Sequence, residues 1–418
     1  MKTYDVIVVG AGAAGILASI SAAENGANVL LLEKMSREGR KMLISGKGRC
    51  NITNTAYQSE FFKKIHPKPK FLKHAFSTFF SKDILNLLSE KGLKTKEERG
   101  GRVFPESDKA ADVVNALLLT VKERNIDIKT NTRVEDIITE NGELKAVKVN
   151  INGKSNRLNT KNIIICTGGK SYPATGSTGD GYILAKKLGH TITELRPALV
   201  PLKTEGNIAE KLQGLGLKNS NVSVWVDNKK IKSEFGETMF AHFGLTGPVI
   251  LTLSKVAIDA FDKQKKVEIS IDLKPALDEQ KLDNRLQREL NESGKKQIRN
   301  ILKNLLPSKL IPVVLELTKI DPYKECNQVS GKERKKIRVL LKDFRLRVSG
   351  HRSYKEAIVT AGGVDTNEID SKTMMSKLVK NLFFAGEVID LDAETGGFNF
   401  QIAFSTGWLA GKSCTVIE

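Results

Sequence analysis

The sequence predicts an α/β fold with a largely parallel sheet, and three observations near its start support this. Residues 4–9 form an apolar run rich in β-branched side chains, typical of a strand buried on both faces. Residues 10–15 follow at once with the pattern G-x-G-x-x-G, and residues 16–25 have the small side chains of a closely packed helix that ends at Gly26. A second buried strand over 28–32 leads to an acid, Glu33. This order of elements predicts a Rossmann-like, dinucleotide-binding domain.

Each position in this first unit has a mechanical role. Gly10 permits the tight turn, Gly12 lets the backbone approach a pyrophosphate, and Gly15 lets the helix pack against the strands. The positive end of the helix dipole favours the phosphates, and Glu33 can accept hydrogen bonds from ribose hydroxyls. We therefore predict cofactor contacts at Gly10, Ala11, Gly12, Ala13, Ala14, Gly15 and Glu33. A membrane anchor is the competing interpretation, because residues 6–23 carry no charge, but the clustered glycines and the missing basic segment argue against it.

Length, composition and charge narrow the possible classes of protein and of partner. The 418 residues are enough for two or three domains, and no other apolar run approaches membrane-spanning length, so a cytoplasmic location is expected. The four cysteines are widely spaced without a C-x-x-C pair, and the five histidines lack ligand spacing, so no disulfide framework and no metal site are expected. The formal net charge of +19 favours anionic partners such as nucleotides, acidic substrates or RNA. The simpler alternative is a lysine-rich solvated surface.

The segment from Lys34 to Asn54 has little periodicity and is rich in glycines and cations. Long segments without regular structure are uncommon unless they are functional. We therefore expect this one, including Lys34, to wrap around the phosphates and ring system of a dinucleotide. A flexible surface loop is the alternative.

The middle of the first domain alternates helices and strands. Helices are predicted over 71–80, 81–90 (capped by Ser81) and 110–124, and a turn-rich loop over 99–105. Strands are predicted over 126–128, 134–138 and 144–149, with turns at Asn141-Gly142 and Asn152-Gly153. A buried strand over 162–166 is followed by Thr167, Gly168 and Gly169, at the edge of the sheet where ligands bind in open α/β folds. A loop rich in Gly, Ser and Thr then leads into a helix that ends near Leu188.

The composition changes near Leu195, and we predict three segments: a cofactor-binding domain over 1–195, an inserted domain over 196–349, and a return to the first domain over 350–418. The inserted domain is expected to have a β part and a helical part, with strands over 222–226 and 266–273 and helices over 282–290, 297–306 and 332–341. Sheet-like sequence resumes at 357–360. A last strand over 382–387 ends on Glu387, and Gly396-Gly397 precede a helix over 402–410.

Two C-terminal features favour FAD over NAD as the dinucleotide. The acid of the Phe-Ala-Gly-Glu strand end can bind ribityl hydroxyls, and the helix that follows Gly396-Gly397 can stabilise negative charge on a reduced flavin at its N1–C2=O edge. A nicotinamide dehydrogenase has no need of a C-terminal segment that returns to the cofactor.

The chain resembles the BaiN-like (YhiN-type) flavoproteins, also known as aminoacetone-oxidase-like FAD-binding enzymes, over its whole length. The most specific matches are GRKMLISGKGRCNITN (39–54), GRVFPESDKAADVVNAL (101–117), TGGKSYPATGSTGDGYILAKKLGH (167–190), HFGLTGP (242–248), AIVTAGGVDTNEID (357–370) and FFAGEVIDLDAETGGFNFQIA (383–403). Two residues depart from the family pattern, since Lys47 replaces a glycine and Met375 replaces an acid.

The resemblance implies a discontinuous FAD domain of the glutathione-reductase type, with an inserted domain that is part β-barrel-like and part helical. It also implies FAD contacts at the N-terminal glycines and Glu33, and a backbone contact to adenine at Val134. The other contacts that it implies are at Arg40, Lys41, Gly48, Arg49, Cys50, Asn51, Gly386, Glu387, Gly397, Phe398, Asn399, Phe400 and Gln401.

Three side chains are candidates for catalysis. Cys50 could be a redox or covalent partner, although a small packed residue is the simpler interpretation. His242 could protonate a substrate, or could be a hydrogen-bonded structural histidine. Arg49 could hold an anionic substrate or the flavin carbonyls.

The sequence thus predicts an FAD-dependent oxidoreductase that transfers hydride to or from a small unsaturated or carbonyl substrate. NAD(P)H would act as a transient reductant, because the glycine fingerprint occurs once. An RNA-associated flavoprotein, of the kind that modifies tRNA, and a redox-silent flavin-binding protein are the alternatives.

Overall fold

The computed structural model describes residues 3–140, 143–151 and 153–416. They divide into two compact units, one comprising Met1–Ala198 with Tyr354–Glu418 and the other Leu199–Ser353. The first unit is therefore built from both ends of the chain. The predicted turn at Asn141-Gly142 and the first residue of the predicted turn at Asn152-Gly153 lie outside the described residues.

A seven-stranded sheet organises the first unit, and it confirms the predicted α/β fold. Its order is β7-β2-β1-β10-β9-β8, and β19 also pairs with β10. The strands are β1 (Tyr4–Val9), β2 (Val29–Leu32), β7 (Asp127–Lys129), β8 (Thr132–Glu140), β9 (Glu143–Ile151), β10 (Lys154–Ile165) and β19 (Leu382–Phe384). Strands β7, β2, β1, β19 and the second half of β10 pair in parallel. Except in β7, their side chains are almost all buried, which explains the continuous apolar runs in the sequence.

Strand β10 belongs to two kinds of pairing. Residues 154–159 pair antiparallel with β9, whereas residues 163–165 pair in parallel with β1 and β19. The first half is mostly exposed and polar, so only the second half gave an apolar signal in the sequence.

Helices and short strands surround this sheet. The helices are α1 (Ala13–Glu24), α2 (Arg40–Ile44), α3 (Gln58–Lys64), α4 (Lys73–Thr78), α5 (Ser81–Glu90), α6 (Ala110–Glu123), α7 (Asp180–Lys187) and α14 (Phe398–Ser413). The short strands are β3 (Thr53–Asn54), β4 (Ile65–His66), β5 (Thr95–Glu98), β6 (Arg102–Pro105), β11 (Arg196–Ala198), β18 (Val359–Ala361) and β20 (Asp392–Ala393).

Several local predictions were wrong. The aperiodic segment after Lys34 contains α2, the 3-10 turn η1 (Ser45–Gly48) and β3, and half of the turn-rich loop over 99–105 is β6. The N-cap of α5 is Phe80 rather than Ser81, and the Asp83 carboxylate accepts the Phe80 N–H at 2.7 Å. Short or amphipathic pieces of this kind carry too few residues for a periodic signal.

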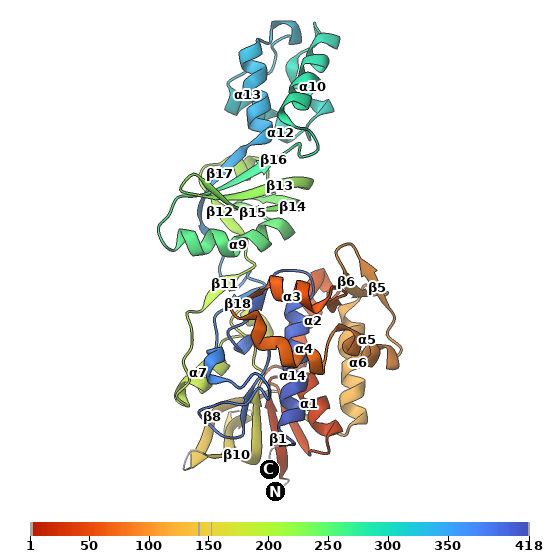
Figure 1. Cartoon of the computed structure of the whole chain (residues 1–418), viewed down its shortest axis with the longest axis vertical. Coiled ribbons are helices and arrows are strands. Elements are labelled where there is room, and N and C mark those ends of the chain that lie inside the picture. Colours follow the sequence, from red (N-terminus) through yellow and green to blue (C-terminus); the bar gives the residue numbers. More distant parts are fainter. Residues whose placement is uncertain (1–2, 141–142, 152, 417–418) are drawn as a thin grey trace. The chain divides into compact units, whose positions relative to one another are not determined.

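Helix α14 packs on α1 with direct backbone contact, and the two helices run side by side in Figure 1. A Cβ at Gly407 would lie 2.3 Å from the Ala14 carbonyl oxygen, and one at Gly411 would lie 2.2 Å from that of Ala18. Glycines four residues apart share one face of a helix. These two therefore let the C-terminal helix approach the helix of the N-terminal glycine motif.

A buried histidine joins the end of α7 to the C-terminal segment. The His190 side chain has no exposed surface; its Nδ1 lies 3.0 Å from Glu368 Oε2 and its Nε2 lies 2.9 Å from Ser376 Oγ. Ser376 Oγ already accepts the N–H groups of Leu378 and Val379, so its hydroxyl donates to Nε2. Nδ1 therefore carries the ring proton and donates to Glu368. Burial lowers the pKa of His190, which keeps the ring neutral.

The Leu199–Ser353 unit combines a closed barrel with a group of helices. The barrel order is β12-β15-β14-β13-β16-β17, and α9 (Pro248–Phe261) packs against it. The strands are β12 (Leu202–Thr204), β13 (Gly216–Val226), β14 (Lys229–Ala241), β15 (Gly244–Thr246), β16 (Val267–Asp272) and β17 (Phe344–His351). The helical part holds α10 (Glu279–Glu292), α11 (Ile298–Ile301), α12 (Leu310–Thr318) and α13 (Gly331–Lys342). A β part and a helical part were both predicted, but β14, β17 and α9 were not.

Across the described ranges, no helix combines the length and apolar character needed to cross a bilayer. The same residues contain no cluster of three or more His, Cys, Asp or Glu side chains placed to hold a metal ion.

The contact between α1 and α14 can be tested with Gly411→Ala. Helix propensity alone favours alanine by about 1 kcal/mol, but the new methyl group would meet the Ala18 carbonyl, and overpacking of this kind costs roughly 1–3 kcal/mol. We expect the clash to dominate and to lower the unfolding temperature of the first unit by several degrees, as measured by calorimetry. Lys412→Ala, at the exposed neighbouring position, should leave that temperature unchanged. A stabilised Gly411→Ala variant would contradict the contact.

The His190 cluster predicts a pH dependence of stability. The unfolded ring has a pKa of about 6.5, whereas the folded pKa is lower, so protons bind the unfolded chain preferentially between these two values. The free energy of unfolding should be highest above pH 6.5 and should decrease as the pH falls through that window. Urea titrations at pH 7.5 and pH 5 measure this slope. His190→Asn keeps a donor for Glu368 but cannot titrate, so it should reduce stability by about 1–3 kcal/mol at pH 7.5. The loss should be smaller at pH 5, which flattens the slope. An unchanged slope in the variant would refute the assignment.

Candidate functional site

Four predicted segments meet at one edge of the parallel sheet. Gly10, Glu33, Thr167 and Glu387 lie at or just beyond the carboxyl ends of β1, β2, β10 and β19, which are neighbouring parallel strands. In open α/β sheets this edge forms the crevice in which ligands bind. The structure thus brings together residues that are almost 380 positions apart in the sequence.

The turn between β1 and α1 has three glycines with different surroundings. Gly10 has φ +102°, and a Cβ there would lie 2.7 Å from the Cys166 carbonyl oxygen; a Cβ at Gly15 would lie 1.8 Å from the Gly10 oxygen. The position of a Gly12 Cβ has no atom within 4 Å. Gly12 is also the N-cap of α1, and no side chain of a described residue caps this helix. An uncapped helix start beside open space fits a pyrophosphate.

Glu33 fastens this turn to the end of β2. Its Oε2 accepts the Ala11 N–H at 2.9 Å, and its Oε1 accepts the Met35 N–H at 2.8 Å. Burial raises the pKa of Glu33, and the two backbone donors act in the opposite direction. Each oxygen keeps a lone pair that can accept a ribose hydroxyl.

Three predicted cofactor residues between Lys34 and Lys41 contact the loop that follows β10. Lys34 Nζ pairs with Asp180 Oδ2 at 2.7 Å, and Arg40 donates to the Ala174 carbonyl at 3.1 Å. Lys41 Nζ donates to Ser171 Oγ at 2.6 Å. These cations therefore hold residues 171–180 against residues 34–41.

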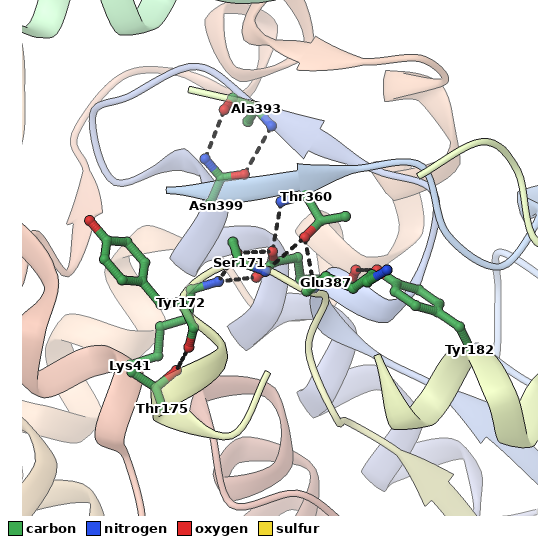
Figure 2. Close-up of polar contacts among 10 residues, drawn as sticks. Lys41, Ser171, Tyr172, Thr175, Tyr182, Thr360, Glu387, Ala393 and Asn399 are labelled. Carbon is green, nitrogen blue, oxygen red and sulfur yellow. Dashed lines mark hydrogen bonds and ion pairs between the residues drawn. The ribbon is translucent and has the colours of Figure 1, made fainter. Parts of the chain in front are cut away.

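The Glu387 carboxylate is the centre of a polar network (Figure 2). Its Oε2 pairs with Lys41 Nζ at 2.6 Å, and its Oε1 accepts Ser171 Oγ and the Thr360 N–H, both at 2.8 Å. Thr360 Oγ1 accepts the N–H groups of Lys170 and Ser171. Gly169 leaves room for this arrangement, because a Cβ there would lie 2.5 Å from Thr360 Oγ1.

The predicted residues 48–51, which follow α2, differ in burial and in their partners. Arg49 pairs with Glu98 at 2.7 Å and with Asp108 at 3.3 Å, and its guanidinium stacks over the Phe104 ring. Cys50 is fully buried, and burial raises the pKa of its thiol to about 12. With its amide oriented to satisfy both groups, Asn51 donates to the Thr53 carbonyl and accepts the Gly397 N–H at 3.0 Å. Gly48 is exposed and has φ +84°.

At the start of α14, most of the predicted side chains pack against or hydrogen-bond to other residues of the protein. Phe398 is buried with its ring edge on Phe61, Phe400 stacks on Phe404, and Asn399 exchanges two hydrogen bonds with the Ala393 backbone (Figure 2). Gln401 accepts Thr53 Oγ1 at 2.6 Å and donates to Ser405. Since no side chain of a described residue caps α14, its backbone N–H groups are the donors that remain for a ligand.

The other predicted residues lie in three places. Val134 is buried in β8 opposite Val149, two residues beyond the start of that strand. Thr167, Gly168 and Gly169 follow β10, and Thr167 Oγ1 is buried without a hydrogen-bond partner among the described residues. His242 is exposed in the Leu199–Ser353 unit, with its ring edge to face against Phe243.

Ser171 and Thr360 were not predicted as site residues. Ser171 lies in the Gly-, Ser- and Thr-rich loop that the sequence did indicate, so the loop was a usable signal. Thr360 was placed on a strand, and nothing in its local sequence indicates that it would face Glu387.

Comparison with known proteins identifies the family and the fold. The family model "HI0933-like protein Rossmann domain" matches residues 4–413. A ribosomal RNA dihydrouridine synthase of Escherichia coli strain K12 is 31% identical over 99% of this chain and 98% of its own length. A 3-dehydro-bile acid delta(4,6)-reductase of Clostridium scindens is 29% identical over 97% of this chain and 98% of its own. The solved open conformation of a flavocytochrome c3 fumarate reductase has a TM-score of 0.51 at 18% identity, over 99% of this chain and 78% of that one, which shows a shared fold.

The match extends over nearly the whole chain, and the resemblance expected from the sequence is confirmed. The chain therefore belongs to the HI0933-like (BaiN/YhiN) family of FAD-dependent oxidoreductases, and it is a flavoenzyme.

Proposed function

We propose that this protein uses bound FAD to reduce a carbon–carbon double bond conjugated with a carbonyl group, in a uridine of ribosomal RNA. The activities after which the Escherichia coli and Clostridium scindens relatives are named support this class of reaction. Forming dihydrouridine saturates the C5=C6 bond of uracil next to a carbonyl, and a 3-dehydro substrate with delta(4,6) bonds is likewise a conjugated ketone. Saturation of a double bond conjugated with a carbonyl adds hydride to the carbon remote from the carbonyl and a proton to the carbon beside it.

The residues at the sheet edge would hold FAD along its length. We assign the pyrophosphate to Gly12 and the start of α1, the adenosine ribose to Glu33, and the ribityl chain to Glu387 with Lys41. The start of α14 would face the N1–C2=O edge of the flavin, where its dipole favours negative charge. Bound FAD supplies the hydride-transfer chemistry, and NAD(P)H would be its transient reductant.

The charge distribution supports RNA as the substrate. The chain has a formal net charge of +19, and the Leu199–Ser353 unit alone has 30 Lys and Arg against 19 Asp and Glu, a net of +11. A polyanion gains affinity from such a surface because each contact with a phosphate releases counterions. A substrate in ribosomal RNA also implies a cytoplasmic location, which we propose as well.

For proton delivery, His242 is our candidate among the three predicted catalytic residues. The Arg49 guanidinium is already paired with Glu98 and Asp108, and the Cys50 thiol, with a pKa of about 12, is neutral at physiological pH. The His242 side chain is exposed, and imidazole is the side chain that most often acts as a general acid or base in enzymes.

Gly12→Asp tests the cofactor site. The glycine has open space around it and an ordinary φ, so the substitution should not strain the fold. Its carboxylate would face the pyrophosphate, and two unit charges about 4 Å apart repel by roughly 4 kcal/mol at an effective dielectric of 20. We expect FAD affinity to fall at least about 100-fold, measured by flavin fluorescence. Gly294→Asp, at a second glycine with open surroundings, should retain FAD. Full FAD content in Gly12→Asp would refute our placement of the pyrophosphate.

The substrate can be tested with unmodified ribosomal RNA transcribed in vitro. Protein reduced by NADPH under anaerobic conditions should oxidise its flavin on mixing with this RNA, and mass spectrometry of the digested RNA should show a uridine heavier by two hydrogens. Gly12→Asp protein should give no product. Rapid reoxidation by a small conjugated ketone, together with no change in the RNA, would instead assign a small-molecule substrate. A flavin that neither NADPH nor dithionite reduces would rule out the reaction altogether.

A further inference from the structure

A cavity of about 500 Å³ lies in the helical part of the Leu199–Ser353 unit, and the proposed flavin chemistry does not use it. It is formed by residues after β16, one face of α10, and the 3-10 turn η4 (Leu302–Asn304) with its neighbour Leu305. Its polar lining consists of four cations and two amides: Lys274, Lys281, Arg285, Arg288, Asn284 and Asn304. None of these lining residues is an acid, but the neighbouring Glu289 pairs with Arg285 and accepts a hydrogen bond from the Asn304 amide at 2.7 Å. The remaining polar groups of the lining are mainly hydrogen-bond donors and positive charge.

Much of this positive charge has no internal counterion. Lys274 and Arg288 form no ion pair with any described residue, and burial together with the nearby Arg285 lowers the pKa of Lys274. Arg285 does pair with Glu289 at 2.5 Å, but its Nε is buried without a hydrogen-bond partner in the described structure. Among the described residues, Lys281 pairs only with the exposed Asp278, at 3.5 Å. An anion in the cavity would satisfy donors that the protein leaves open.

The cations of α10 form a row. Lys281, Arg285 and Arg288 are separated by four and three residues, so they lie on one face of the helix. At 1.5 Å of rise per residue the row is about 10 Å long. One strand of a DNA duplex advances about 3.4 Å per phosphate along its axis, and the spacing in an RNA helix is of the same order. The row can therefore meet more than one backbone phosphate.

We infer that this cavity binds phosphate groups of the RNA backbone and positions the RNA substrate, an inference that rests on the proposed function. Arginine forks and amide donors match phosphate oxygens, and the volume admits a phosphate with its sugar. The surrounding surface favours a polymer over a single anion, since residues 279–342 contain 16 Lys and Arg against 8 Asp and Glu. A free nucleotide such as NADPH offers the same phosphate chemistry, so the test includes it as a separate arm.

The test compares two double variants of the full-length, FAD-bound protein. Lys274→Gln with Arg288→Gln removes two cavity cations and breaks no described ion pair. Lys335→Gln with Lys336→Gln removes the same charge from exposed positions on α13 outside the cavity, where neither lysine forms a described ion pair. Binding of deproteinised ribosomal RNA to the oxidised protein is measured over a range of salt concentrations, and circular dichroism with FAD content verifies folding.

We expect the cavity variant to bind RNA at least tenfold more weakly and to lose about 1.5 to 2 units of the slope of log K against log [salt], as the loss of two phosphate contacts requires. Its KM for RNA should rise with kcat unchanged, and flavin reduction by NADPH should be unaffected. The control variant should lose no more than about threefold. Equal losses of RNA affinity in both variants would refute RNA binding at the cavity. A rise in the KM for NADPH without a change in RNA binding would refute it too.

The two proposals fail separately in this design. Weaker RNA binding by the cavity variant, with no dihydrouridine formed by the unaltered protein, would support RNA binding at the cavity and refute the proposed reduction of uridine. Product formation with equal RNA binding by the cavity and control variants would sustain the reaction and refute the cavity.

Discussion

Direct contact between the backbones of α1 and α14 is the constraint on which the candidate site depends. Helix α1 is fixed to the sheet through the Gly10–Gly15 turn, and the close approach at Gly407 and Gly411 fixes α14 to α1. Gly386 follows the same rule, because a Cβ there would lie 2.8 Å from the Ala14 Cβ. Since these approaches leave no space for a side chain, the start of α14 and the residues after β19 keep one position relative to the N-terminal glycines. Under the proposed placement of FAD, two distant parts of the sequence would thus hold the cofactor from its two ends.

The second constraint is electrostatic and concerns the pair of Lys41 and Glu387. Both side chains are largely removed from water, with exposed fractions of 24% and 19%, and such a pair is stable only when neighbouring groups satisfy the remaining donors and acceptors. The Lys41 ammonium has three protons, and Glu387 and Ser171 use two of them. The Glu387 carboxylate has about four acceptor sites, of which Lys41, Ser171 and the Thr360 N–H use three. One donor and one acceptor remain, and their directions are set before a ligand arrives.

The sequence predicted the parts of this structure that depend on local pattern. The β1–α1–β2 unit, the family and the two kinds of structure in the inserted unit followed from glycine spacing, apolar runs and long motifs. The partners of the charged residues did not follow. Lys34 and Arg49 were predicted to contact FAD, but the structure pairs them with Asp180 and with Glu98, because those acids come from segments whose position depends on the tertiary fold. Thr360 was missed for the same reason, since its contact with Glu387 requires β18 to leave the main sheet.

The cations of this protein therefore divide into two kinds, and the net charge of +19 does not distinguish them. At the sheet edge, Lys34, Lys41 and Arg49 each have an acidic partner, so their charge is neutralised locally and serves mainly to position loops. Around the α10 cavity, Lys274 and Arg288 form no ion pair with a described residue, although Arg288 lies close enough to Glu289 to help lower the pKa of that carboxyl. An approaching polyanion gains little from cations that are already paired and much from those that are not. Under the proposed function, RNA would therefore be attracted to the helical part, and the polar groups of the proposed flavin site would stay oriented for chemistry.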